Sequence, residues 1–69
     1  MRDFREIIEC IKAYMYNQTK VYDKDVAKRL GINQAQFATL KRRNSTPYSH
    51  ILTFCYEEGL CANELFFKS

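Results

Sequence analysis

The sequence predicts an all-α fold, a compact bundle of about five helices in a single domain spanning residues 1–69. Apolar residues recur at three- and four-residue spacing, as they do on one face of a helix. The two glycines and the single proline stand between such segments. No segment sustains the alternation that is typical of a strand. A core of this size leaves little room for an enclosed active site, so we do not expect an enzyme.

A first helix is expected from Asp3 to about Tyr16. Its inner face consists of apolar residues at helical spacing: Phe4, Ile7, Ile8, Ile11, Tyr14 and Met15. Asp3 followed by Glu6 predicts a capping box at its start. Residues 17–22 break the pattern and indicate a connection.

A short second helix is expected after this connection, with Asp23 as its N-cap. Its inward residues are Val26, Ala27 and Leu30. Gly31 ends it, because glycine takes left-handed backbone without a steric penalty. A turn of about three residues then joins it to a third helix at a steep angle, and the small side chain of Ala27 lets the two helices approach.

The third helix is expected to open at Asn33, which forms a second capping signature with Gln36, and to run to about Arg43. Its buried side consists of Phe37 and Leu40.

Two further helices are expected after the turn at residues 44–46. Thr46 predicts the N-cap of the fourth helix and Pro47 its first position. Its expected core residues are Ile51, Leu52 and Cys55, and Gly59 ends it. The last helix lies within residues 62–67 and buries Leu65 with either Phe66 or Phe67.

Charge is unevenly distributed along the chain. Residues 20–43 hold seven basic and two acidic residues, a net charge of +5, whereas the remainder carries −2. Such a concentration is the electrostatic footprint of a polyanion binder, although a solvated lysine-rich face gives the same count.

The segment V-A-x-x-L-G-I followed by N-Q-x-x-F-x-x-L resembles the helix-turn-helix of lambda-repressor-like DNA-binding domains. The later L-K-R-R-N-S-x-P-Y, I-L-x-F-C, E-G-L and E-L-F-F are similar to the bacteriophage CI repressor helix-turn-helix family. The resemblance covers about residues 21–67 and implies a helix-turn-helix at about 23–43, with the third helix in the DNA major groove. It also implies the N-terminal part of a longer repressor with an oligomerisation or peptidase domain. Asp23 departs from the family pattern, in which a polar or basic residue at the start of the second helix often meets a phosphate. An acid there is expected to repel the DNA backbone.

The outer face of the third helix is expected to read bases, since two alanines permit close approach and Gln34 can both donate to and accept from adenine. The expected base-facing residues are Gln34, Ala35, Gln36, Ala38, Thr39 and Arg42. The expected phosphate contacts are Lys24, Lys41, Arg43, Asn44, Ser45, Thr46 and Tyr48.

These features predict sequence-specific binding of double-stranded DNA by a cytoplasmic, repressor-like transcription regulator. A homodimer on a pseudo-palindromic operator is expected to pair through the first helix or residues 65–67. The alternative is a protein-interaction bundle, antitoxin-like or adaptor, which would expose an apolar face in place of a basic one. We expect no membrane segment and no cofactor. We expect no metal site either, since His50 and the three cysteines lack zinc-ligand spacing.

Overall fold

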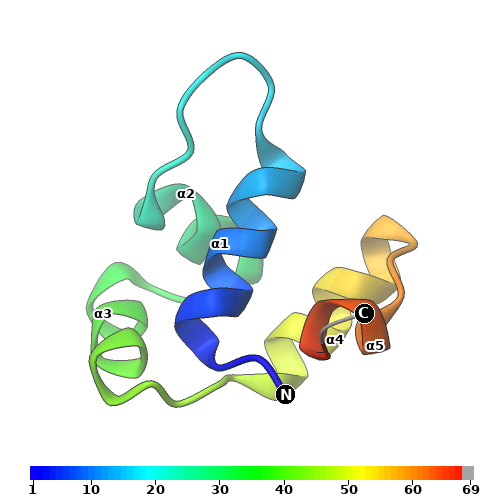
Figure 1. Ribbon diagram of the computed structural model, residues 1–69. Coiled ribbons are helices and arrows are strands. Elements are labelled where there is room, and N and C mark those ends of the chain that lie inside the picture. The colour runs from blue at the N-terminus through cyan, green and yellow to red at the C-terminus, as the bar shows by residue number, and fades with distance from the viewer. Residues whose placement is uncertain (68–69) are drawn as a thin grey trace.

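The computed structural model describes residues 1–67, which form five α-helices and no strand (Figure 1). The helices are α1 (Phe4–Met15), α2 (Asp23–Leu30), α3 (Gln34–Arg43), α4 (Tyr48–Glu58) and α5 (Ala62–Phe66). The radius of gyration is 11.2 Å, close to the roughly 11 Å expected of a compact domain of this length. The predicted all-α, five-helix architecture is confirmed.

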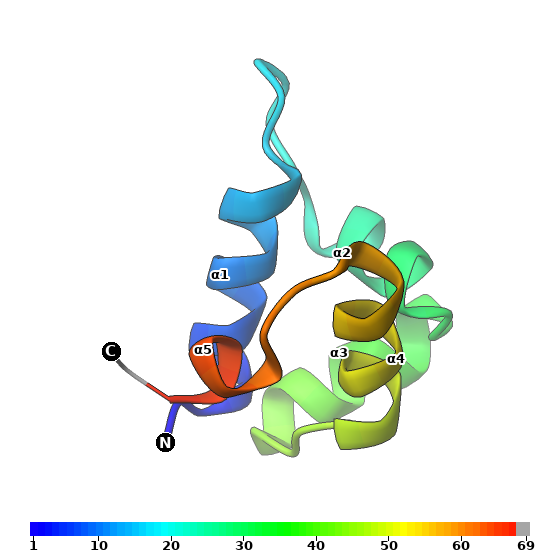
Figure 2. The same cartoon turned by 90° about the vertical axis from the view of Figure 1, so that its right-hand side faces the viewer.

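The start of the chain lies against α5 (Figure 2). The backbone N–H of Arg2 donates to the carbonyl of Phe66 at 2.6 Å, and the Arg2 guanidinium donates to the carbonyl of Glu64 at 3.1 Å. These bonds hold the first residues against the last helix and close the bundle around α1.

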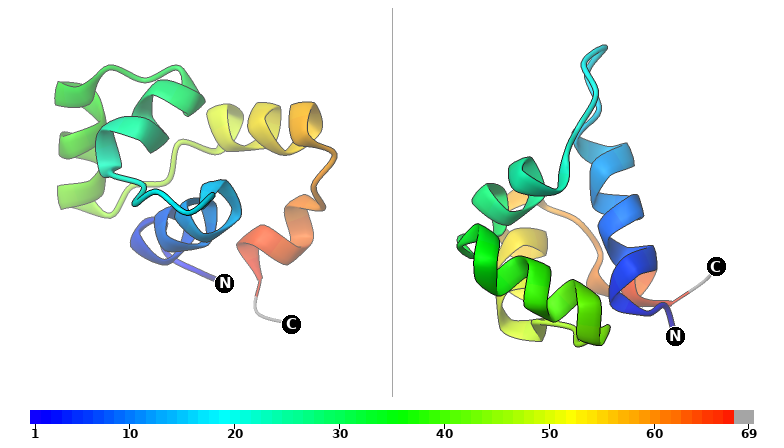
Figure 3. Two further views of the ribbon diagram at one scale, coloured as in Figure 1. Left: turned by 90° about the horizontal axis from the view of Figure 1, so that it is seen from above. Right: turned by 90° about the vertical axis from the view of Figure 1, so that its left-hand side faces the viewer.

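The helices α3 and α5 lie on opposite sides of the bundle, with α1 between them (Figure 3). Residues 31–33 connect α2 directly to α3. The longer connection between α1 and α2 rises away from the other elements (Figure 1) and includes Gln18 with φ +63°. No helix within residues 1–67 has the length and apolar character needed to cross a bilayer.

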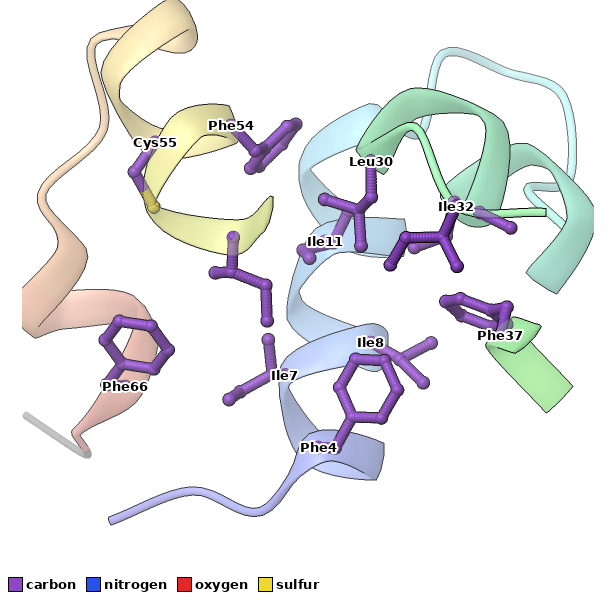
Figure 4. Close-up of a cluster of buried hydrophobic side chains, with 13 residues drawn as sticks. Phe4, Ile7, Ile8, Ile11, Leu30, Ile32, Phe37, Phe54, Cys55 and Phe66 are labelled. Atoms are coloured by element: carbon purple, nitrogen blue, oxygen red, sulfur yellow. The ribbon is translucent and has the colours of Figure 1, made fainter. Parts of the chain in front are cut away.

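The core is centred on α1, whose inner residues are fully buried: Phe4, Ile7, Ile8 and Ile11. Phe37 of α3 meets Phe4 edge-to-face, with ring centroids 5.5 Å apart (Figure 4). Phe54 and Cys55 reach the core from α4, and Phe66 reaches it from α5 (Figure 4). One side of α3 is therefore anchored to α1 through an aromatic contact.

The helix ends follow the capping chemistry of the sequence. At α1 the capping box is present: Asp3 Oδ1 accepts from the N–H of Glu6 at 2.8 Å, and the Asp3 N–H donates to the Glu6 carboxylate at 3.2 Å. Asn33 Oδ1 accepts from the N–H of Gln36 at 2.7 Å, which caps α3. Gly31, at φ +75°, takes the left-handed backbone predicted at the end of α2, and Gly59, at φ +68°, does the same after α4.

Two predicted N-caps are wrong. The N-cap of α2 is Tyr22, whose backbone N–H donates to the side chain of Asp25 at 2.9 Å; Asp23 is the first helical residue and its carboxylate bonds elsewhere. In α4 the cap position is Pro47, not Thr46, and it makes no side-chain capping bond. Here the carbonyl of Thr46 accepts from the Tyr48 N–H at 3.0 Å, so the turn continues through the proline before the helix begins.

Two expected core residues, Tyr14 and Leu52, lie at the surface and are each 48% exposed. Met15 and Leu40 are half-buried and pack against the core. In α4 the inward positions are Ile51, Phe54 and Cys55, because Phe54 supplies a larger apolar surface than Leu52 in the neighbouring register.

At the C-terminal end Phe66 is buried and Phe67 is half-exposed, while Leu65 is half-buried. The inner face of α1 and Phe66 are therefore part of the core. The expectation that a homodimer pairs through the first helix or residues 65–67 stays a prediction.

Candidate nucleic-acid interface

The outer face of α3 is an open helical surface at one edge of the bundle (Figure 3, right). Five of the six residues predicted to face bases are exposed, and Thr39 is half-buried. Gln34, Ala38 and Arg42 follow one another at four-residue spacing, so they lie in one row along the helix. The structure thus brings an amide, a methyl group and a guanidinium together in a line.

This row borders a groove of about 490 Å³ between α2 and α3. The groove is lined by Arg5, Asp23, Lys24, Ala27, Gln34, Phe37, Ala38, Lys41 and Arg42. Small and apolar side chains form part of its lining, and basic side chains come from three helices. The groove therefore combines close access to the backbone of α3 with positive charge.

The Thr39 side chain forms a hydrogen bond within its own helix, which the sequence does not indicate. Its hydroxyl donates to the carbonyl of Ala35 at 3.1 Å, four residues earlier. The hydroxyl oxygen can still accept, and the methyl group can contact an apolar surface such as a thymine methyl.

Asp23 joins three helices through an ion-pair cluster with Lys12 of α1 and Lys41 of α3, which we call the Asp23 cluster. Lys12 Nζ lies 2.6 Å from Asp23 Oδ1, and Lys41 Nζ lies 2.6 Å from Asp23 Oδ2. Burial opposes ionisation of Asp23, but the hydrogen bonds and charges of the two lysines outweigh it, so its pKa is lowered. The hydrogen bond to Asp23 raises the pKa of Lys12. Lys41 is therefore part of an internal cluster, a setting that the sequence did not indicate.

A second group of cations surrounds the start of α2. Lys20 Nζ and Lys24 Nζ lie 5.3 Å and 5.8 Å from the centre of the Tyr22 ring. Lys24 also lines the groove beside α3, as expected of a phosphate contact. Lys20 was missed as a candidate, although its place in the basic segment 20–43 was the available signal.

The C-terminal end of α3 is tied to α1. Asn44 takes left-handed backbone with φ +54°, and its Oδ1 accepts from the backbone N–H of Phe4 at 3.0 Å. The Arg5 guanidinium donates to the carbonyls of Lys41 and Arg42 at 3.3 Å and 3.4 Å. A cation at this end of a helix also complements the helix dipole. Arg5 was missed because no local pattern in the first helix distinguishes it.

The remaining predicted phosphate contacts lie around this end. Arg43 and Ser45 are exposed, and Thr46 is half-buried. The backbone N–H of Ser45 donates to the carbonyl of Leu40 at 2.9 Å, which leaves its side chain available. Tyr48 is 48% exposed and its ring lies 5.5 Å from that of Phe66.

Positive charge dominates this side of the molecule. No acidic residue occurs between Asp25 and Glu57 in the sequence. Within residues 1–67, seven basic side chains form no ion pair with a carboxylate: Arg2, Arg5, Lys20, Lys24, Lys28, Arg42 and Arg43. Four of these seven, Arg5, Lys24, Arg42 and Arg43, lie on α3 or beside its groove.

On the side formed by α2 and α4, the basic side chain is paired with acidic ones. Arg29 bonds Glu57 at 3.2 Å and Glu58 at 2.5 Å, and its guanidinium lies 4.8 Å from the Phe54 ring. Tyr14 donates to Glu58 at 3.0 Å. Arg29 is thus excluded from the open basic surface.

The described residues 1–67 contain no group of three histidine, cysteine or acidic side chains placed to hold a metal ion. Cys55 is buried, Cys10 half-buried and Cys61 exposed. His50 Nδ1 lies 3.1 Å from the carbonyl of Leu30, so the tautomer with a proton on that nitrogen donates to the end of α2.

The chain matches no protein-family model, and comparisons with curated proteins and with solved structures return no significant match. Its function is therefore inferred from its own residues and their geometry.

Proposed function

We propose that this chain binds double-stranded DNA in a sequence-specific manner as the DNA-binding domain of a repressor-like transcription regulator. The observation that carries the proposal is the row of Gln34, Ala38 and Arg42 on the open face of α3, beside a groove lined by cations from three helices. In this proposal the mechanism is occupancy of a DNA site by α3.

The dimensions and side chains of α3 suit the major groove. An α-helix with its side chains is about 10–12 Å across, which matches the roughly 12 Å width of the major groove. The ten residues of α3 make it about 15 Å long. Ala35 and Ala38 allow the helix to approach base edges closely. Gln34 can bond both polar groups of an adenine edge, and Arg42 can bond a guanine.

Cations on both sides of α3 would hold the phosphate backbone. Lys24 lies across the groove from α3, and Arg43 and Ser45 lie at its far end. The side chains of Lys41 and Asn44 each have an internal partner, so we assign them a smaller share of the phosphate contacts than the sequence predicts. Arg5, which also lines the groove, is added to the candidates.

A homodimer on a pseudo-palindromic operator remains part of the proposal. Half-site centres would then lie about one helical turn, roughly 34 Å, apart. The inner face of α1 is fully buried, so any pairing surface would have to come from other residues. Sedimentation of the protein on its selected duplex measures this stoichiometry.

A protein-interaction bundle is the second candidate, and one observation favours it. Leu52 and Tyr56 are four residues apart on α4 and are 48% and 88% exposed. Ser49 and Thr53 lie at helical spacing on the same uncharged face. Such a face would suit a polypeptide partner better than DNA.

The test is selection of bound sequences from a random duplex pool. A DNA reader enriches a defined motif, and a variant with Gln34→Ala and Arg42→Ala should lose or change that motif while remaining folded. A parallel variant with Leu52→Ala and Tyr56→Ala, on the candidate protein-interaction face of α4, should enrich the parental motif. If the parent protein enriches no sequence, the proposed function is wrong and the interaction bundle is favoured.

A further inference from the structure

Among the described residues that line the groove between α2 and α3, Asp23 is the one acid. Its side chain is 37% exposed, and both carboxylate oxygens lie 2.6 Å from lysine ammonium groups. An acid at the edge of a DNA-binding surface should repel phosphates. The two lysines offset this repulsion, and Lys12 Nζ also lies 3.5 Å from the carboxylate of Glu9.

A carboxylate and a DNA phosphate compete for the same donors. Each presents negative oxygens that accept short, charge-assisted hydrogen bonds from an ammonium group. Lys12 and Lys41 can therefore be held by Asp23 or by the backbone of a bound duplex.

We propose that Asp23 is an internal competitor of DNA phosphates, which holds the ammonium groups of Lys12 and Lys41 and so limits the affinity of this surface for DNA of any sequence. This inference rests on the proposed function and adds to it a residue that sets the strength of charge-driven binding. Affinity that depends on charge alone does not distinguish an operator from other DNA. Asp23 thereby moderates the part of binding that carries no sequence information.

Breaking an ion pair of a binding surface is usually expected to weaken binding, but loss of the Asp23 carboxylate should strengthen it. Removing the carboxylate of Asp23 frees the ammonium group of Lys41 and leaves Lys12 with Glu9, whose carboxylate lies 3.5 Å from Lys12 Nζ. Each phosphate neutralised by a protein cation releases condensed counterions. Binding to random DNA should therefore strengthen, although the cross-link between α1, α2 and α3 is lost.

The experiment compares the parent protein with Asp23→Asn on a random-sequence duplex, by fluorescence anisotropy at several salt concentrations. We expect roughly three- to tenfold tighter binding near 0.1 M salt, and a plot of log affinity against log salt that is steeper by about one unit. The matched control is Glu64→Gln, which changes net charge equally from the exposed surface of α5. We expect it to change affinity less than about twofold.

Lys41→Gln made in both backgrounds separates competition from simple addition of charge. In the parent protein Asp23 already occupies Lys41, so the salt slope should fall by less than about half a unit. In the Asp23→Asn background the same change should lower the slope by about one unit. Equal effects in the two backgrounds would overturn the inference.

Two other results would also overturn it. One is an Asp23→Asn protein that binds random DNA as the Glu64→Gln control does. The other is weaker binding by a variant that circular dichroism shows to be folded, because Asp23 would then position the lysines for phosphates. Asp23→Ser, which also suits the first turn of a helix, is the second variant if the first does not fold.

Failure of the inference is distinguishable from failure of the proposed function. Random DNA requires no sequence reading, so a protein that enriches no motif from a pool still shows the effect of Asp23 on charge-driven binding. Elution from heparin, a second polyanion, measures the same effect where duplex binding is too weak to titrate. Asp23→Asn should elute at higher salt than the parent protein and the Glu64→Gln control, and elution together with them contradicts the inference.

Discussion

Lys41 Nζ lies 2.6 Å from Asp23 Oδ2, which joins the last turn of α3 to the first residue of α2. Lys12 of α1 approaches the other oxygen of the same carboxylate. One side chain thus fixes three helices relative to one another at the edge of the candidate DNA surface. Its protonation state should therefore affect the stability of the bundle.

The pKa of Asp23 is lowered from its ordinary value of 3.8, so this carboxyl group favours the folded state wherever it is ionised. The contribution should be complete above about pH 4 and should disappear as the pH falls through the lowered pKa. The pKa of Lys12 is raised, so its contribution should be complete below about pH 10 and should be lost above that range. Urea unfolding of the parent protein and of Asp23→Asn, measured from neutral to acid pH, checks the first limit. A stability difference that does not shrink toward pH 2 would contradict the ion-pair assignment.

Gly31 should tolerate side chains better than its place between two helices suggests. The sequence predicts that valine there costs roughly 1 to 3 kcal/mol, through left-handed strain and through crowding against Ala27. A Cβ at Gly31 would meet no atom within 4 Å, so alanine there should not be crowded. Gly31→Ala should cost about 1 kcal/mol from backbone strain alone, and Gly31→Asn should cost less. A loss above about 3 kcal/mol for alanine in chemical denaturation would show that space, not φ, limits this position.

We expect Asn44 to contribute more to the stability of the fold than to phosphate binding. Asn44→Ala loses the bond to the Phe4 N–H and puts alanine, which tolerates left-handed backbone less well than asparagine, at φ +54°. We therefore expect a loss of about 1 to 3 kcal/mol in unfolding free energy. Asn44→Gly keeps the backbone conformation and removes only the bond. If both variants melt as the parent protein does but bind random DNA more weakly, Asn44 acts on the phosphate backbone.

Ile51 and Leu52 are adjacent in α4 but should respond differently to truncation. Ile51 is fully buried and Leu52 is 48% exposed. Ile51→Ala should therefore cost about 2 to 5 kcal/mol, whereas Leu52→Ala should cost less than about 1 kcal/mol. Equal losses in thermal or urea unfolding would restore the register of α4 that the sequence predicts.

The helices could be predicted from the sequence because their signals are local. The capping box of Asp3 and the left-handed glycines depend on residues within one turn, and the periodicity of α1 specifies its buried face. The register of α4 could not be predicted in the same way. Leu52 and Phe54 compete for the inward position, and the choice depends on how α4 packs against distant helices.

The chemistry of the candidate surface was predictable in part. The exposed row on α3 follows from placing Phe37 inward, which requires only the helical period. The partners of Asp23, Asn44 and Arg5 lie 11 to 40 residues away in the sequence, and no spacing rule connects them. Long-range polar contacts of this kind depend on the folded arrangement, and they give Lys41 and Asn44, which the sequence assigned to DNA phosphates, partners within the protein.

The most direct test of the central claim, that α3 reads DNA sequence, is the binding of Gln34→Ala to a selected duplex and to a random one. Fluorescence anisotropy at several salt concentrations measures both, with Arg43→Ala as the control for phosphate contact. Gln34→Ala should cost about 1 to 3 kcal/mol on the selected duplex and little on random DNA. Arg43→Ala should weaken both about equally and flatten the salt dependence by roughly one unit. If Gln34→Ala weakens both duplexes to the same extent, α3 does not read sequence through this residue and the account of the interface is wrong.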